Sequence, residues 1–260
     1  MLTAEQKCHY ETFGYLHLKQ VLTQDEIETI QQESNRIFNQ KRGDVSFDGQ
    51  KRQAVIPFFE YSPTLMRFIE DDRIYLIGQD LLGENIILNA TEGNLHVGNT
   101  EWHGAIDPPG TVAAVKIAIY LEANTKDTGA LRVIPGTHKY EFGMLMEPMH
   151  QQHENPSQMP FGVLGPDMPC VVLETQPGDL VVFPERLWHA AFGGRAGRPQ
   201  HAVNYQAYPA SDEQVAELCH MYEGFNYSLH PATTLINNDS PRLRSLVEPL
   251  VKLGFEPWEI

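Results

Sequence analysis

The spacing of hydrophobic residues predicts helices in the first third of the chain. The stretch LTQDEIETIQQESNRIFNQK (22–41) starts with a capping box, in which Thr23 is followed three residues later by Glu26. Four apolar residues then recur at helical spacing and share one face. They are Ile27, Ile30, Ile37 and Phe38. The pattern predicts an amphipathic helix that buries this face.

A second helical region is predicted to begin at Ser62-Pro63, with serine as N-cap and proline at the first helical position. It continues with a break through Leu81-Leu82 and stops at Gly83. The helical pattern returns at the end of the chain, in SDEQVAELCHMYEGF (211–225) and SPRLRSLVEPLVKLG (240–254). Helices are therefore predicted on both sides of the central part of the chain.

From residue 85 onward the hydrophobic pattern changes to short β-branched runs divided by Gly, Pro and Asn. The runs are NIILNATEGNLHV, VAAVKIAIYLEA, ALRVIPG, PCVVLETQ, GDLVVFPE and QHAVNYQAYP. Six or more strands after a helical start predict a mostly β fold with flanking α-helices, either an antiparallel barrel or a two-sheet jelly roll. We expect one domain over 1–260, with a helical part at about 1–84, a jelly-roll core at about 85–210 and C-terminal helices at about 211–260.

Composition narrows the possible partners. The net charge of −15 and the lack of a basic patch argue against a nucleic-acid partner. No apolar run is long enough to span a membrane, and the charged N-terminus does not resemble a signal peptide, so we expect a cytoplasmic protein without a membrane partner. The three cysteines are widely spaced, which fits neither a disulfide framework nor a zinc site. The oligomeric state is left open.

A long irregular segment (144–169) interrupts the strands and is rich in Met, Pro, Gln and His. Loops of this length inside a compact domain are usually functional and often cover a site. His150 and His153 in this segment are candidates for contact with a substrate.

Two other histidines follow predicted strands directly. His103 lies in TEWHGAID and His189 in GDLVVFPERLWHAAFGG. On adjacent strand ends of a jelly roll, two neutral imidazoles can converge on one metal ion, and two His with one carboxylate form the facial triad of non-haem Fe(II) oxygenases. Arg198 follows His189 within one strand length, and its guanidinium could bind a dicarboxylate through a bidentate contact.

Three stretches together resemble the phytanoyl-CoA dioxygenase family of Fe(II)/2-oxoglutarate oxygenases. They are the opening YETFGYLHLKQVLTQDEIETIQQE, the segment VKIAIYLEANTKDTGALRVIPGTHK and the strand PGDLVVFPERLWHA. The family uses a double-stranded β-helix, which agrees with the fold predicted from the hydrophobic pattern. The resemblance covers most of the chain.

The resemblance implies roles for particular residues. His103 would be the proximal and His189 the distal ligand of Fe(II), and Arg198 would bind the far carboxylate of 2-oxoglutarate. Arg195 is the second candidate for that arginine, and Lys116, on an alternating strand, could assist the co-substrate. The implied cofactors are Fe(II), 2-oxoglutarate and dioxygen, and the implied reaction takes place at an unactivated C–H bond of a small molecule.

The chain departs from the family at the carboxylate ligand. The family motif is His-x-Asp, whereas this chain has His103-Gly104-Ala105. Residues i and i+2 of a strand face the same side, so Ala105 holds the ligand position. Asp107 at i+4 would lie roughly 13 Å further along an extended strand and would reach the metal only through a bend. Glu101 at i−2 has the same-face geometry, but the family places no ligand there.

Three interpretations follow from this departure. In the first, Ala105 leaves a coordination position open for chloride, which resembles the Fe(II)/2-oxoglutarate halogenases with their His-x-Ala or His-x-Gly motif. In the second, Asp107 folds back and completes the triad of a hydroxylase. In the third, the protein is a jelly roll that binds a ligand without turning it over.

Overall fold

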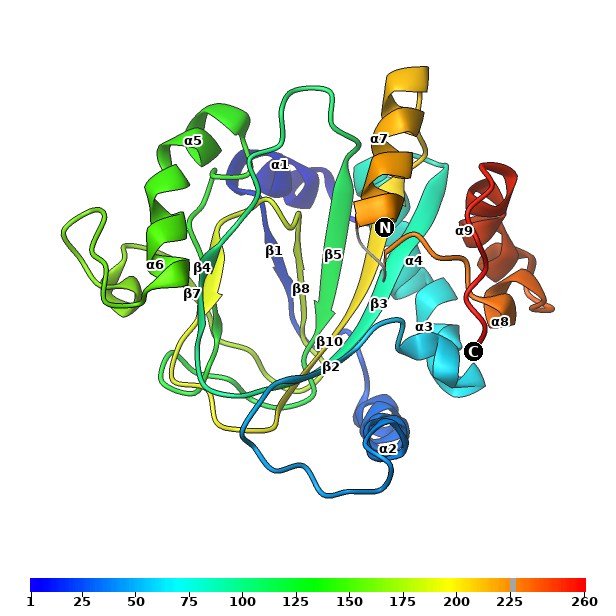
Figure 1. Ribbon diagram of the computed structural model, residues 1–260, viewed down its shortest axis with the longest axis horizontal. Helices are drawn as coiled ribbons and strands as arrows, with labels where there is room; N and C mark the ends of the chain where they lie inside the picture. The colour runs from blue at the N-terminus through cyan, green and yellow to red at the C-terminus, as the bar shows by residue number, and fades with distance from the viewer. Residues whose placement is uncertain (225–227) are drawn as a thin grey trace.

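Two antiparallel sheets form the centre of the molecule in the computed structural model, which describes residues 1–224 and 228–260. Within these residues, the larger sheet has the strand order β1-β8-β5-β10-β3-β2 and the smaller sheet the order β4-β9-β6-β7. From β3 to β10 the chain passes repeatedly between the sheets, as a jelly roll requires (Figure 1). The strands are β1 (Leu16–Leu18), β2 (Gln53–Val55), β3 (Ile86–His96), β4 (Thr100–His103), β5 (Ala114–Ile119), β6 (Leu131–Val133), β7 (Val171–Leu173), β8 (Leu180–Phe183), β9 (His189–Ala191) and β10 (Arg198–Ala207).

The predicted fold class is confirmed, and so are the six predicted strands, which correspond to β3, β5, β6, β7, β8 and β10. The two strands β4 and β9 were not predicted as such. His103 is the last residue of β4 and His189 the first residue of β9, so each histidine lies within a short strand of its own. Both strands have three or four residues, too few to show an alternating pattern in the sequence.

The predicted helices are confirmed together with their caps. Thr23 and Glu26 form the capping box at the start of α2 (Gln24–Lys41), and Ser62 caps α3 (Pro63–Glu70). The expected break falls at Asp71, whose side chain caps α4 (Asp72–Leu82). The remaining helices are α1 (Ala4–Phe13), α5 (Tyr140–Leu145), α6 (His150–Glu154), α7 (Asp212–Gly224), α8 (Thr233–Ile236) and α9 (Pro241–Lys252). Phe225, at the end of one predicted helix, lies outside the described residues.

Side-chain alternation on the larger sheet separates a packed outer face from a polar inner face. On β5, Val115, Ile117 and Ile119 belong to the apolar cluster that includes buried residues of α2, α3, α4 and α9. The intervening Lys116 and Ala118 face the smaller sheet and line a cavity. The helices therefore cover one face of the sheet and leave the other face to a site (Figure 1).

The long segment 144–169 packs against the outside of the smaller sheet. Trp102 and Trp188 precede the two histidines in β4 and β9, so their side chains point to the opposite face. There they form a buried cluster with Met149 and Phe192. The Trp102 indole donates to the Gly165 carbonyl at 2.7 Å. Met149 and Gly165 of this segment therefore pack behind the strands that carry the histidines.

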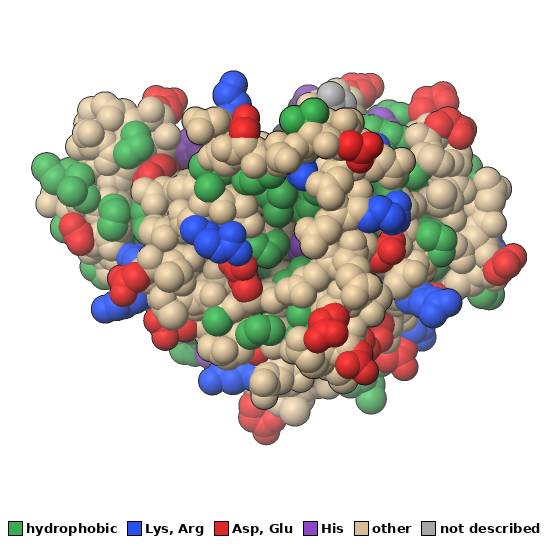
Figure 2. Space-filling model, turned by 90° about the horizontal axis from the view of Figure 1, so that it is seen from below, with side chains coloured by type: hydrophobic (Ala, Val, Ile, Leu, Met, Phe, Trp, Pro, Cys, Tyr) green, Lys and Arg blue, Asp and Glu red, His purple; other side chains and the backbone are tan. Residues whose placement is uncertain are grey.

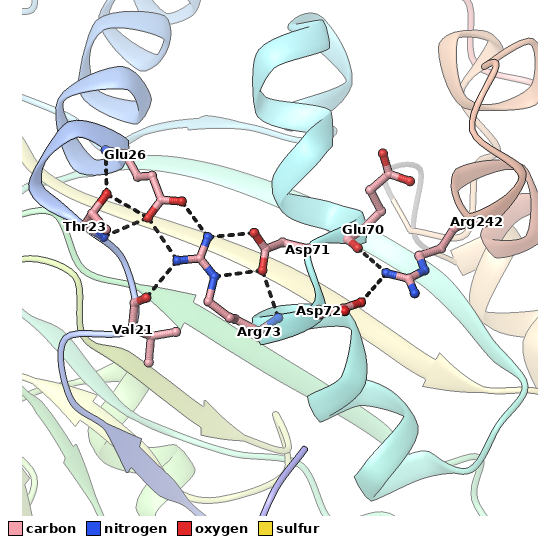
Figure 3. A network of polar contacts seen from close by, with 8 residues as sticks. All are labelled: Val21, Thr23, Glu26, Glu70, Asp71, Asp72, Arg73 and Arg242. Atoms are coloured by element: carbon pink, nitrogen blue, oxygen red, sulfur yellow. Dashed lines mark hydrogen bonds and ion pairs between the residues drawn. The ribbon is translucent and has the colours of Figure 1, made fainter.

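An ion-pair network joins the helices that cover the larger sheet (Figure 3). Arg73 of α4 donates to both carboxylate oxygens of Glu26 on α2, at 3.0 and 2.5 Å, and to the carboxylate of Asp71 at 2.9 and 2.7 Å. Arg242 of α9 similarly donates to Asp72 at 2.6 Å. These contacts fix α2, α4 and α9 relative to one another. No helix in the described part of the chain is long and apolar enough to cross a membrane.

Glu60 is a buried carboxyl group within this helical layer, and it makes stability depend on pH. It is 4% exposed and accepts a hydrogen bond from the Thr91 hydroxyl. Burial raises the pKa of Glu60 from 4.5 to about 7. Between these two pH values the unfolded chain loses the proton while the folded chain keeps it. Stability therefore falls as pH rises from 4.5 to 7, by roughly 3 kcal/mol.

We expect Glu60→Gln to remove this dependence, because the amide oxygen can still accept from Thr91 but carries no charge. The free energy of unfolding in urea should be higher than that of the native chain at pH 8 and should lose this advantage at pH 4.5. Glu84→Gln, at an exposed position, is the matched control and should not differ from the native chain. An equal effect of both variants would contradict the assignment to Glu60.

Candidate metal and co-substrate site

A cavity of about 100 Å³ lies between the two sheets. It is lined from the smaller sheet by His103 and His189 and from the larger sheet by Lys116 and Arg198. The view from below shows a hollow near the middle of that face, walled by hydrophobic side chains with a histidine inside it (Figure 2). The other lining residues are Arg52, Glu92, His96, Thr100, Ala118, Tyr120, Gly129, Leu131, Phe183, Ala190, Ala191 and Gln200.

The antiparallel pairing of β4 with β9 places His103 directly opposite His189, with ring centroids 4.0 Å apart. Each Nδ1 contacts a backbone carbonyl two residues earlier in the chain. The partners are Glu101 at 2.8 Å and Leu187 at 2.7 Å. Because a carbonyl only accepts, Nδ1 carries the proton of each neutral ring and Nε2 keeps a free lone pair.

The electrostatics of the cavity also favour neutral imidazoles. Burial lowers the pKa of His103, and burial together with His103 lowers that of His189 well below its ordinary value. Neutral imidazoles with an oriented Nδ1–H and a free Nε2 are the usual form of histidine metal ligands. The pair therefore fits a transition-metal ion such as Fe(II).

Neither Ala105, at the predicted ligand position, nor Asp107, the candidate carboxylate, lines this cavity. Strand β4 ends at His103, so the extended geometry assumed for the next residues does not continue, and Ala105 is exposed beyond the strand. Asp107 lines a second cavity, where its carboxylate lies 3.9 Å from Arg186. Over residues 1–224 and 228–260, no three His, Cys, Asp or Glu side chains are grouped so that they could hold a metal ion.

Arg198, the first residue of β10, is a buried cation without a counter-ion. Its side chain is 3% exposed, forms no ion pair with any described residue, and has a buried Nε without a hydrogen-bond partner. Burial lowers its pKa, but a guanidinium stays charged in proteins. An unpaired buried charge is costly, so this position fits an anionic ligand such as a dicarboxylate. Arg195, the second candidate, pairs with Glu122 and does not line the cavity.

Two glycines make room for the Arg198 guanidinium. A Cβ on Gly129 would lie 2.6 Å from the Nε of Arg198, and a Cβ on Gly194 would lie 2.9 Å from the same atom. Gly129 also has a φ of +95°, which side chains rarely adopt. Gly129, the first glycine of the segment TGALRVIPG, therefore leaves open the space that the Arg198 side chain occupies.

Lys116 lies in the cavity between two carboxylates. Its ammonium contacts Glu92 at 2.8 Å and Glu185 at 2.7 Å. Burial alone would raise the pKa of Glu92, but Lys116 outweighs it and the pKa is lowered. Asn204 donates to the same carboxylate at 2.6 Å. Lys116 thus belongs to an internal ion-pair network.

Sequence reasoning missed Glu92 and Arg52. Arg52 donates to the Asn94 side-chain oxygen through Nε at 3.0 Å and through Nη2 at 2.6 Å, at the wall of the cavity. Glu92 could have been found from the sequence, because the polar residues Glu92, Asn94 and His96 recur at every second position of β3 and therefore share one face. Arg52 lies in an irregular stretch before β2 and gave no signal of its own.

The histidines of the long segment take different positions. His153 of α6 is exposed, and its ring centroid is 6.0 Å from that of His103. His150 packs against Trp188, with ring centroids 4.9 Å apart. Only His153 therefore lies near the paired imidazoles.

The jelly roll is similar in fold to two solved proteins. HygX from Streptomyces hygroscopicus, solved with nickel and 2-oxoglutarate bound, superposes with a TM-score of 0.62 at 22% identity over 80% of this chain and 88% of that one. SnoN, a non-haem α-ketoglutarate-dependent epimerase from nogalamycin biosynthesis, superposes with a TM-score of 0.59 at 20% identity, over 78% and 82% of the two chains.

The family follows from the sequence match. Residues 10–202 match the phytanoyl-CoA dioxygenase (PhyH) family, and the chain belongs to that family, as its motifs suggested. The ectoine dioxygenase of Streptomyces anulatus is 24% identical over 166 residues, covering 58% of this chain and 56% of that protein. The chain thus spans about half the length of the first curated relatives it matches.

We expect Gly129→Ala to weaken the binding of 2-oxoglutarate, because the added methyl group displaces the Arg198 guanidinium. Calorimetric titration in the presence of Fe(II), without oxygen, should give a Kd raised roughly tenfold or more. Gly83→Ala is the matched control, since Gly83 also has a positive φ, of +100°, but nothing within 4 Å of its Cβ position. If both variants bind 2-oxoglutarate equally well, Gly129 does not act through Arg198.

Proposed function

We propose that this protein is an Fe(II)- and 2-oxoglutarate-dependent oxygenase that acts on an unactivated C–H bond of a small molecule. The observation that carries the proposal is the pairing, in one cavity, of two neutral imidazoles with a buried arginine that has no counter-ion. His103 and His189 would hold Fe(II) through Nε2, and Arg198 would pair with the far carboxylate of 2-oxoglutarate. When bound, Fe(II) with 2-oxoglutarate and dioxygen supplies an oxidant strong enough to remove hydrogen from carbon.

Family membership supports this proposal, and the relatives support a small-molecule substrate. Ectoine dioxygenases are among the curated relatives, and HygX was solved with nickel and 2-oxoglutarate. The chain's own residues would bind the two cofactors and keep the Nδ1 protons of the imidazoles on backbone carbonyls. This fixes the direction from which Nε2 meets the metal. The chain's net charge of −15 gives no support to a nucleic-acid partner.

For the finer chemistry we propose halogenation, with chloride at the coordination position that the motif His103-Gly104-Ala105 leaves without a carboxylate. The location of Asp107 supports this choice, since its carboxylate faces Arg186 in a separate cavity. Hydroxylation with Asp107 as third ligand is the alternative. It is favoured by the dioxygenases among the relatives, and it requires the segment 104–113 to refold toward the imidazoles.

The proposed cofactor site can be tested by spectroscopy. Fe(II) and 2-oxoglutarate, added without oxygen, should produce a visible charge-transfer band in the native protein. We expect His189→Ala to lower Fe(II) affinity roughly a hundredfold, because one of two protein ligands is lost, and to abolish the band. A native protein that shows no band and consumes no 2-oxoglutarate with any substrate would support the third interpretation, a binding protein without catalysis.

Asp107→Ala separates the two catalytic alternatives. If the open position accepts chloride, the variant should retain Fe(II) with unchanged affinity and retain the charge-transfer band. Loss of Fe(II) comparable with that in His103→Ala would identify Asp107 as the third ligand and exclude the halide position. Mass spectra of the product, with and without chloride in the buffer, then show whether chlorine or a hydroxyl group has been added.

A further inference from the structure

A second cavity, of about 540 Å³, lies beside the metal cavity. Its walls come from α1, from the segment that follows His103, from the turn after β6 and from Arg186. The residues that matter for its chemistry are Tyr10, Asp107, His138, Lys139 and Arg186. It is larger than the cavity between the sheets and is not needed for binding Fe(II) or 2-oxoglutarate.

We call Gly104, Glu185 and Arg186 the shared wall, because they connect the linings of the two cavities. Glu185, next to Arg186 in the chain, contacts the ammonium of Lys116, which lines the metal cavity. On the other side, a Cβ on Gly104 would lie 3.1 Å from the Arg186 carbonyl, and Gly104 follows His103 directly. A molecule held in the second cavity would therefore lie next to the proposed metal position.

Two residues that line this cavity each carry a buried polar atom without the partner that buried groups normally have. The Nε of Arg186 and the Nδ1 of His138 are both buried without a hydrogen bond to any described residue. The guanidinium of Arg186 has only one ionic contact in the described chain, the Asp107 carboxylate at 3.9 Å, which is too long for a hydrogen bond. An arginine with a fork of unused donors is suited to a carboxylate or phosphate.

The charges around the cavity single out Arg186 as the group that can accept an anion. Lys7 is neutralised by Asp80 at 2.6 Å, and Lys139 is exposed to solvent. Burial lowers the pKa of His138, so that ring is neutral. Burial raises the pKa of Asp107, which weakens the one carboxylate that contacts Arg186. The other acidic residues of the lining are Glu11 and Glu141.

We propose that Arg186, together with the hydroxyl of Tyr10, binds a carboxylate or phosphate group of the small-molecule substrate. The rest of the substrate then extends past the shared wall toward the metal cavity. This inference rests on the proposed function for its substrate, whereas the anion site itself does not depend on turnover. In this arrangement Asp107 is a neighbour of the anion site and helps to orient Arg186, without contacting the metal.

The test follows the side-chain Nε–H signals of arginine by NMR in the full chain labelled with ¹⁵N-arginine. Zn(II) replaces Fe(II) to avoid paramagnetism, and 2-oxoglutarate is present to occupy Arg198. Acetate and inorganic phosphate are titrated separately, with chloride at equal ionic strength as control. Arg186 is assigned by the signal lost in Arg186→Lys, or by triple-resonance experiments if that variant does not fold.

We expect a saturable shift of the Arg186 signal with at least one probe. Saturation by acetate indicates a carboxylate substrate, and saturation by phosphate indicates a phosphorylated one. Tyr10→Phe should raise the midpoint roughly tenfold, as expected for the loss of one hydrogen bond to a charged group. A linear shift no larger than that of Arg36, which lies on the surface in an ion pair with Glu33, would overturn the proposal.

The two proposals fail in different ways. If 2-oxoglutarate does not perturb the Arg198 signal while Arg186 still saturates, the anion site stands and the proposed function is wrong. If 2-oxoglutarate binds at Arg198 and neither probe saturates Arg186, the oxygenase stands and the anion site is wrong.

Discussion

The pairing of β4 with β9 is the constraint on which the rest of the site depends. These are short strands, and little besides their register brings His103 opposite His189. Their outward neighbours, Trp102 and Trp188, are fully buried in a cluster closed by the segment 144–169. Large buried aromatic side chains contribute strongly to packing, so the cluster stabilises a register that such short strands would hold only weakly alone. The long segment thus acts on the site from behind.

Opposite the histidines, the inner face of the larger sheet carries charge that the jelly roll has to compensate. On this face Lys116 forms ion pairs with Glu92 and Glu185, and Asn204 extends the network by a hydrogen bond to Glu92. Arg198, which lines the same cavity, has no such ion pair with any described residue. A fold that satisfies one buried cation fully and leaves another without a partner reserves the second for a ligand, because an unpaired buried charge otherwise only destabilises the protein.

The sequence predicted the parts of this structure that depend on local signals. Capping residues such as Thr23, Ser62 and Gly83 mark helix ends through backbone hydrogen bonds that involve only their neighbours. The course of the chain after His103 was not predictable in this way. Strand alternation gave Ala105 and Asp107 a common direction, but β4 ends at His103 and Asp107 contacts Arg186, a residue distant in sequence. Contacts of that kind depend on how the sheets close.

The net charge of the proposed metal centre connects the missing carboxylate with the rest of the site. An Fe(II) ion held by two neutral imidazoles and dianionic 2-oxoglutarate would have no net charge, whereas an additional carboxylate ligand would make the centre negative. In the proposed halogenation no carboxylate of the motif His103-Gly104-Ala105 reaches the metal, and chloride from solution would restore that negative charge. Burial lowers the pKa of both rings, and Lys116, which lines the same cavity, adds to this effect and would attract such an anion. Glu185 is 57% exposed at its side chain and competes for the same ammonium. Under this proposal the affinity of the centre for an anion would depend on whether Glu185 stays on Lys116, and this would link the chemistry at the metal to the wall shared with the second cavity.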